Sequence, residues 1–532
     1  MRTQITIKGM ACKGFASYPT LFGRGLVAEP ACCSRRNFAV SSNGMATDPP
    51  AIQRHRTALH RRDHSLPVKC AMRDGLIAPE LSVFDYGCGH GRDVDLLATK
   101  GIAVQGWDPA FCPHNPCQAA DVVNLGYVIN VIEDPEERAA TLRKAWDLCR
   151  RLLIVSAQVL VPGRGQAQVE FGDGILTGRG TFQRFYGQVE LKSYIETELE
   201  AEAFSAEIGV FYVFKDETAG QQYLASRYRR RVAAPRKRIS EVRFEESREL
   251  LEPFMAMIAT LGRLPETDEF QPATEIEARF GSLNRAFSLV KRVTGADEWE
   301  AITRRCSEDL LVYLALGRFR RRPPISVLPV GLQRDIRAFF GSYMNACRMA
   351  DELLFKAGDA EAVDEACRRS PIGKLLPNSL YIHREALESL DPLLRVYEGC
   401  ARTYLGEIEG ANLIKLHRES GRVSYLVYPE FETDAHPELL RSVKLSLRSR
   451  QIDCLEYGAS SNPPVLHRKE TFLLPDHPLH AKFARLSEQE EKHGLLTDTA
   501  TIGTRDGWNA RLKEAGYAVK GHRLVKRKGG AD

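Results

Sequence analysis

One short run in the 532-residue chain has the residue types and spacing of a ligand-binding turn. An apolar strand pattern ends at Asp85, and Gly87, Gly89 and Gly91 follow before a helical pattern begins. Glycine has no β-carbon, so such a turn lets the backbone come within van der Waals distance of a ligand. The helix that follows directs its free N–H groups at whatever is bound there. These four residues are therefore predicted binding residues.

A second acid, Asp108, follows Gly91 by 17 residues and stands at the predicted end of the next strand. A carboxylate there can accept both hydroxyl hydrogens of an adenosine ribose. The glycine spacing differs from the dinucleotide pattern, and no Gly-Lys-Ser or Gly-Lys-Thr follows to make a phosphate loop. Asp-x-Gly-x-Gly-x-Gly is similar to the loop of S-adenosylmethionine-dependent methyltransferases. The predicted cofactor is therefore S-adenosyl-L-methionine; the alternative is a glycine turn that binds nothing.

Asn124 and Tyr127 are the candidate catalytic residues, because they follow a third strand where a substrate would meet the methyl donor. Their spacing is similar to the Asn-Pro-Pro-Tyr motif of amino-methylating DNA methyltransferases. In that motif the amide accepts an amino hydrogen and the ring stacks on a flipped base. Both prolines are missing here, so an ordinary strand end packed by the tyrosine is the alternative.

Strands that alternate with helices must position these residues, which predicts a Rossmann-like α/β domain with a mostly parallel sheet. Only about 12 residues separate Asp108 from Asp121, too few for the usual helix and third strand, so an abbreviated core is expected. The expected strands are 81–84, 102–106, 121–123, 152–155 and 209–214, and the expected helices are 67–73, 93–99 and 136–150.

The length indicates several domains, and 43% hydrophobic with 27% charged residues is ordinary for a soluble globular protein. Amphipathic patterns such as 308–319 and 332–355 indicate helices after the first domain. The predicted division is a non-conforming leader (1–44), a methyltransferase-like domain (51–217), a basic linker (226–243), a helical domain with possible DNA binding (245–400) and an α+β region (401–532).

The leader is basic, contains serine and has a single acid, which is typical of a transit segment. The alternative is a start codon assigned too early, with Met45 as the first residue. The thirteen cysteines are scattered without a disulfide framework, and no run of eighteen apolar residues occurs. A cytoplasmic protein without a membrane span is expected.

A net charge of +5 does not by itself indicate nucleic acid, so local clustering has to carry that argument. Arg229, Arg230, Arg231 and Lys237 form a basic run that could neutralise phosphates. The alternative is a solvated linker. A pattern with a glycine turn near residue 281 indicates a two-helix hairpin, suited either to DNA binding or to packing.

Cys112, His114 and Cys117 offer three soft ligands within six positions. A zinc site needs a fourth ligand or a water, and prolines at 113 and 116 indicate a loop that need not bind anything. No metal is predicted.

The sequence resembles the DNA phosphorothioation-associated methyltransferases over nearly everything after Met45. The likeness rests on the glycine turn, Gly106-Trp107-Asp108-Pro109, 120–133, 180–183 and 462–470. The resemblance implies a bacterial methyltransferase encoded beside systems that put sulfur into the DNA backbone, with DNA and proteins of such a system as partners. The alternatives are a non-catalytic DNA-binding component of that system and a small-molecule methyltransferase.

The run 462–470 also concentrates ionisable groups after an Asn-Pro-Pro turn. A second site is one interpretation of this run, and a turn set by the prolines is the other.

Overall fold

The computed structural model describes residues 52–159, 169–230, 234 and 242–527. The predicted leader, Arg231, Lys237 and most of the basic linker lie outside the described residues. No helix in the described part of the chain is both long and apolar enough to cross a membrane.

The first sheet has six strands in the order β2-β1-β3-β4-β9-β8. Neighbours from β2 to β4 are parallel, whereas β9 is antiparallel to both of its neighbours. The chain leaves β1 toward β2 and returns to β3 on the other side, so the strand order reverses between β1 and β3, where ligands bind in such sheets. The strands are β1 (Ser82–Tyr86), β2 (Ala103–Trp107), β3 (Ala120–Gly126), β4 (Cys149–Ser156), β8 (Ala203–Glu207) and β9 (Val210–Phe214).

The order confirms the mixed α/β class and the abbreviated core, because β2 leads to β3 with no helix or further strand between them. β8 was not expected from the sequence. A small antiparallel sheet, β5-β6-β7, comes before the helix that leads into β8. Its strands are β5 (Val169–Phe171), β6 (Gly174–Leu176) and β7 (Phe182–Gln183).

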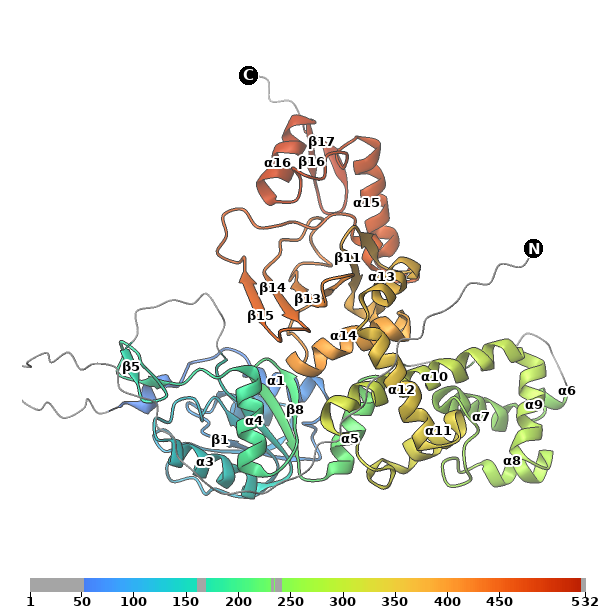
Figure 1. Ribbon diagram of the computed structural model, residues 1–532, viewed down its shortest axis with the longest axis horizontal. Helices are drawn as coiled ribbons and strands as arrows, with labels where there is room; N and C mark the ends of the chain where they lie inside the picture. The colour runs from blue at the N-terminus through green and yellow to red at the C-terminus, as the bar shows by residue number, and fades with distance from the viewer. Residues whose placement is uncertain (1–51, 160–168, 231–233, 235–241, 528–532) are drawn as a thin grey trace, which may run out of the picture. The chain divides into compact units, whose positions relative to one another are not determined.

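Alternating strand residues are buried on opposite faces of the main sheet, as period-two geometry requires. On one face Val123 and Leu153 pack with α3 (Pro135–Leu148) and α4 (Gln188–Leu199) (Figure 1). On the other face Val122 and Leu152 belong to a core shared with several other helices. Those nearest in sequence are α1 (Leu66–Arg73), α2 (Arg92–Thr99) and α5 (Glu217–Ser226), and the 3-10 helix η1 (Arg54–Thr57) precedes them.

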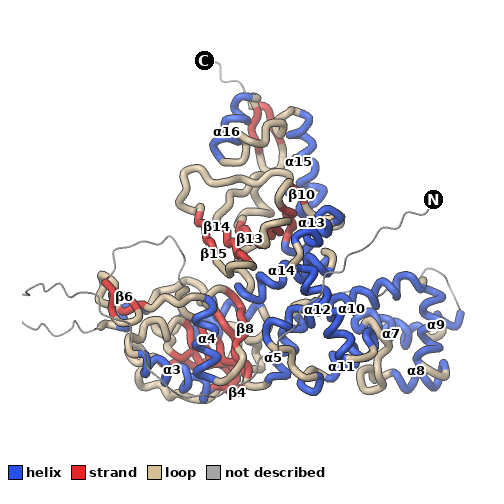
Figure 2. The backbone as a smooth tube through the Cα atoms, viewed as in Figure 1, coloured by secondary structure: helices blue, strands red, loops and turns tan. Residues whose placement is uncertain are grey.

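A helical region follows (Figure 2). The amphipathic pattern over 332–355 covers two helices: Gly341, with φ +73°, ends α11, and Ser342 caps α12 by accepting from Asn345 N. The helices are α6 (Val242–Glu245), α7 (Arg248–Leu261), α8 (Ala273–Phe280), α9 (Leu283–Thr294), α10 (Ala296–Gly317), η2 (Arg318–Arg320), η3 (Ile325–Val327), α11 (Val330–Phe340), α12 (Tyr343–Ala357), α13 (Ala360–Arg369), η4 (Arg384–Ser389) and α14 (Pro392–Leu405).

A second six-stranded sheet runs in the order β10-β11-β12-β13-β14-β15, with every neighbouring pair antiparallel. Its first two strands fall within residues 245–400, the range expected to be helical. The strands are β10 (Lys374–Leu376), β11 (Ser379–His383), β12 (Leu413–His417), β13 (Arg422–Val427), β14 (Arg441–Ser446) and β15 (Ile452–Glu456). The chain ends with η5 (Lys469–Phe472), α15 (His480–Lys492), α16 (Arg505–Glu514), β16 (Tyr517–Val519) and β17 (Leu524–Lys526).

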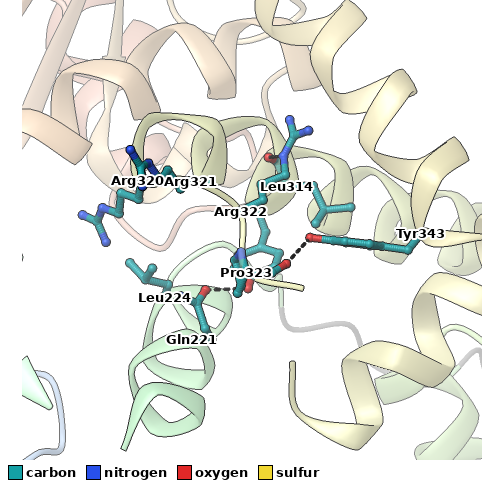
Figure 3. A pocket seen from close by; sticks show the side chains of 10 residues that line it. Gln221, Leu224, Leu314, Arg320, Arg321, Arg322, Pro323 and Tyr343 are labelled. Atoms are coloured by element: carbon teal, nitrogen blue, oxygen red, sulfur yellow. Dashed lines mark hydrogen bonds between the residues drawn. The ribbon is translucent and has the colours of Figure 1, made fainter. Parts of the chain in front are cut away.

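A small pocket lies where α5 meets the end of α10 and the start of α12 (Figure 3). Gln221 accepts from the Tyr313 hydroxyl at 2.9 Å, and the Tyr343 hydroxyl donates to the Pro323 carbonyl at 2.7 Å. Its volume of about 10 Å³ is room for about one water. This pocket is therefore a small gap between packed helices and is too small to hold a cofactor.

Candidate functional site

The glycine turn joins β1 to α2, as expected. Gly87, Gly89 and Gly91 have φ of +81°, +55° and +75°, a region that residues with a β-carbon rarely adopt. A β-carbon at Gly87 would lie 2.4 Å from Val128 Cγ2, and one at Gly89 would lie 3.3 Å from Ala58 Cβ. The three glycines are thus required by the backbone conformation, in addition to any ligand.

Asp108 lies against this turn, although 17 residues separate it from Gly91 in sequence. Its Oδ2 accepts from Gly89 N at 3.0 Å, and its Oδ1 accepts from Ala110 N at 2.9 Å and from Phe111 N at 3.1 Å. The carboxylate is half-buried. An ionised carboxylate has about four lone-pair sites, so these three bonds leave capacity for a ribose hydroxyl.

Asp85 and Asn124 form a buried pair between β1 and β3. Asn124 Nδ2 donates to Asp85 Oδ1 at 2.8 Å. Asn124 is 2% exposed and Asp85 is 5% exposed. Burial, with a smaller contribution from the charge of Asp93, raises the pKa of Asp85 to about 7. Asn124 Oδ1 is buried without a hydrogen-bond partner among the described residues. A predicted substrate residue and a predicted cofactor residue therefore touch, and an unused acceptor remains beside them.

Tyr127 follows β3 in the left-handed region, with φ +60°. Its N–H donates to the carbonyl and to the hydroxyl oxygen of Ser156, at 3.0 and 3.1 Å, which holds the unusual conformation. Burial raises the pKa of the phenol to about 12. A non-glycine residue with positive φ costs free energy and is concentrated at functional sites, so this conformation singles out Tyr127 at the end of the strand.

The segment before α1, residues 53–61, crosses the same edge of the sheet. Arg54 pairs with Glu133 at 2.8 Å and holds the pKa of that carboxyl below its ordinary value. Gln53 N donates to the Gly180 carbonyl at 3.0 Å. The only sequence signal was charge: a basic segment and an acidic one, 133–137, of opposite sign.

Aromatic rings connect this segment to the glycine turn. The His60 and His90 rings stack with centroids 3.8 Å apart, and His90 contacts Phe111 at 4.2 Å. The Arg61 guanidinium lies 5.8 Å from the Tyr127 ring. Residues 53–61 therefore form one wall of the candidate site.

The three soft ligands of the loop after β2 do not form a metal-binding group within the described ranges. His114 is exposed, and the Cys112 thiol instead contacts Cys88 of the glycine turn.

The described part of the basic run is held by internal contacts. Arg230 Nε lies 2.5 Å from Asp309 Oδ1 and its Nη2 lies 2.9 Å from Glu308 Oε2; the side chain is 12% exposed. Arg229 is more exposed and donates to the Thr260 carbonyl at 3.0 Å. The nucleic-acid role of this run stays a prediction, and the ion pairs of Arg230 count against that residue.

No protein-family model matches the chain, and no curated protein matches it. Among solved structures, a 1,6-didemethyltoxoflavin N1-methyltransferase from Burkholderia thailandensis with bound S-adenosylhomocysteine is 14% identical, covering 28% of this chain and 79% of its own at a TM-score of 0.21. Magnesium protoporphyrin IX methyltransferase from Synechocystis PCC 6803 is 14% identical over 31% of this chain and 93% of its own, with a TM-score of 0.22.

A third structure, an amino pentose methyltransferase from Micromonospora echinaspora with bound S-adenosylmethionine, is 14% identical over 31% of this chain and 92% of its own, with a TM-score of 0.23. These neighbours are S-adenosylmethionine-dependent methyltransferases. The likeness is distant and partial, and the fold described above rests on strand order and direction.

Proposed function

We propose that residues 51–217 bind S-adenosyl-L-methionine and transfer its methyl group to DNA. The observation that carries the proposal is the contact of Asp108 with the Gly89 N–H at the point where the strand order reverses. It joins a glycine-rich turn to a ribose acceptor at the edge where such sheets bind ligands. Of the residues described, the unpartnered Asn124 Oδ1 adds an acceptor at the same edge.

The cofactor supplies an electrophilic methyl group, and the chain's own residues position what surrounds it. Asp108 would accept ribose hydroxyl hydrogens, while the glycine turn leaves room for the adenosine. Methyl transfer needs an in-line nucleophile more than a strong base, so orientation accounts for most of the acceleration. Asn124 Oδ1 would accept an amino hydrogen of the acceptor, and the Tyr127 ring would stack on it.

DNA as the acceptor is supported by three features of the sequence. The Asn124 and Tyr127 spacing is similar to that of base-methylating enzymes, the run 226–243 is basic, and the family resemblance implies a phosphorothioation system. The alternatives are a DNA-binding component that keeps the cofactor pocket without catalysis and an enzyme acting on a small molecule.

Titration calorimetry with S-adenosylhomocysteine tests the cofactor step. Asp108→Ala should weaken binding at least tenfold, since it removes hydrogen bonds made by a charged group worth about 1.5–3 kcal/mol each. Asp95→Ala, on the exposed side of α2, is the matched control and should bind as wild type. Equal affinity in both variants would remove Asp108 from the site.

Tritiated methyl donor mixed with plain or phosphorothioated DNA tests the acceptor. Label in DNA supports the enzyme, whereas DNA binding without label supports the non-catalytic alternative. A mobility-shift series over salt then tests the basic run, with Arg229, Arg231 and Lys237 changed to Gln and Arg230 kept because it is an internal ion-pair partner. The three changes should flatten the salt slope by about three, and an unchanged slope would make the run a solvated linker.

A further inference from the structure

Three ligating side chains from distant parts of the C-terminal region meet away from the site described above. They are His436 after β13, His467 before η5, and Glu490 on α15. Their ligand atoms all lie within 4.8 Å of one another. His436 and Glu490 are 8% and 1% exposed, and His436 Nε2 lies 2.8 Å from Glu490 Oε1.

A hydrogen bond from Nε2 of His467 fixes the orientation of its ring. Its Nε2 lies 2.8 Å from the Ile502 carbonyl, which can only accept, so Nε2 carries the hydrogen. A neutral imidazole with its hydrogen on Nε2 has a lone pair on Nδ1, the atom that a metal ion would use. That Nδ1 is buried and finds no hydrogen-bond partner in the described part of the chain.

The surroundings hold the two rings in place. Both histidine rings pack on the Trp508 ring of α16, with centroids 4.6 Å away in each case. A histidine that ligates a metal usually donates its second N–H to a carbonyl or carboxylate, as His467 does to Ile502. Two histidines and one glutamate are a ligand set for zinc that keeps a fourth position open.

The distances require only a modest contraction. Tetrahedral bonds of about 2.0–2.1 Å place ligand atoms about 3.3 Å apart. The pair His436 and Glu490 would widen slightly from 2.8 Å, and His467 would move closer, from a separation of at most 4.8 Å. Rotation about side-chain bonds covers such shifts.

One side of the cluster opens to solvent. His436 and Trp508 line a cavity of about 710 Å³, together with Val465 and Arg505. An ion held by three protein ligands here would take its fourth ligand, a water, from this side. We propose that His436, His467 and Glu490 bind one divalent transition-metal ion, with Zn²⁺ the best match, whose fourth position faces this cavity.

The test uses the full chain, stripped with a chelator and titrated with Co²⁺ as a spectroscopic substitute for Zn²⁺. Wild type should bind one equivalent with the visible bands of four-coordinate cobalt and without the intense charge-transfer bands of thiolate ligands, which separates this site from the chain's cysteines. His467→Gln and Glu490→Gln should weaken binding on the order of 100-fold, at least the loss that removing an outer-shell partner causes.

His493→Gln and Glu491→Gln are matched controls, because both residues are exposed and lie at the end of α15 or just after it. They should bind cobalt as wild type does. Chelation should also lower the unfolding temperature of wild type, a measurement that does not depend on the folding of any variant. The proposal would be overturned by absence of cobalt binding, by thiolate bands, by equal losses in the controls, or by an unfolding temperature indifferent to chelator. Each of these results would leave only an internal contact between His436 and Glu490.

Discussion

Replacing Asp85 by asparagine should remove a pH dependence of stability that this buried carboxyl introduces. Burial and, to a lesser extent, the charge of Asp93 raise the pKa of Asp85 to about 7 from an ordinary 3.8, against the hydrogen bond from Asn124. Below pH 3.8 the Asp85 carboxyl is protonated in both the folded and the unfolded chain. As pH rises, the unfolded chain ionises first, so stability falls until the pH exceeds about 7, the folded pKa.

One unit of pKa corresponds to about 1.4 kcal/mol, so the interval between 3.8 and about 7 amounts to roughly 4 kcal/mol. Roughly 3 kcal/mol of that loss falls between pH 5 and pH 8. Asp85→Asn does not ionise, keeps the acceptor for Asn124 Nδ2, and can offer its own amide hydrogens to the unpartnered Asn124 Oδ1. The free energy of unfolding of the variant relative to wild type should therefore rise by roughly 3 kcal/mol from pH 5 to pH 8.

Urea unfolding of wild type and Asp85→Asn at the two pH values measures this difference. Asp95→Asn, exposed on α2, is the control, and its difference from wild type should be the same at both. A difference for Asp85→Asn that does not change between pH 5 and pH 8 would refute the reasoning, because the folded carboxyl would then be ionised throughout.

Three further predictions concern single positions. Gly87→Ala should destabilise by about 1–3 kcal/mol more than Gly75→Ala in thermal unfolding, because both glycines have positive φ but only the former would meet Val128, at 2.4 Å, whereas the latter faces open space. Tyr127→Phe should keep methyl transfer within a few-fold, since the phenol, with a pKa of about 12, stays neutral. Tyr127→Ala should lose about tenfold or more, because a stacked base is worth about 1–3 kcal/mol. Asp309→Ala should lower the free energy of unfolding by about 3–5 kcal/mol by leaving two paired arginines without their carboxylate.

The local parts of the fold could be predicted from the sequence because they depend on neighbouring residues. Short apolar runs identified β1 to β4, and the spacing of Asp108 and Asp121 identified the abbreviated core. The glycine turn followed from residue type alone, since positive φ at 87, 89 and 91 admits little else. The pairing of Asp108 with the turn followed from the parallel strands, whose carboxyl ends share one edge.

Features that depend on distant contacts could not be predicted in the same way. The basic pattern of 226–243 says nothing of Asp309, whose carboxylate holds Arg230, 79 residues away in sequence. The apolar spacing of 332–355 continues through Gly341 without interruption. The helix nevertheless ends there, because Gly341 adopts a left-handed conformation. His436, His467 and Glu490 have no ligand spacing along the chain; they come from the segment after β13, the segment before η5 and α15, which tertiary packing brings together.

The missing third strand and the fixed position of Asp108 belong to one arrangement. In a doubly wound sheet, a further strand and its crossover helix would flank β2. Here the chain turns back at once: Cys112 N donates to the Asp108 carbonyl at 3.0 Å, and Asn115 Nδ2 donates to the Gly106 carbonyl at 2.7 Å. N–H groups two and three residues after Asp108 hold one carboxylate oxygen, and the glycine turn holds the other. The short loop thus gives the carboxylate the rigidity that a strand and helix give elsewhere, so a core with one strand fewer still presents a fixed acceptor where the ribose is proposed to bind.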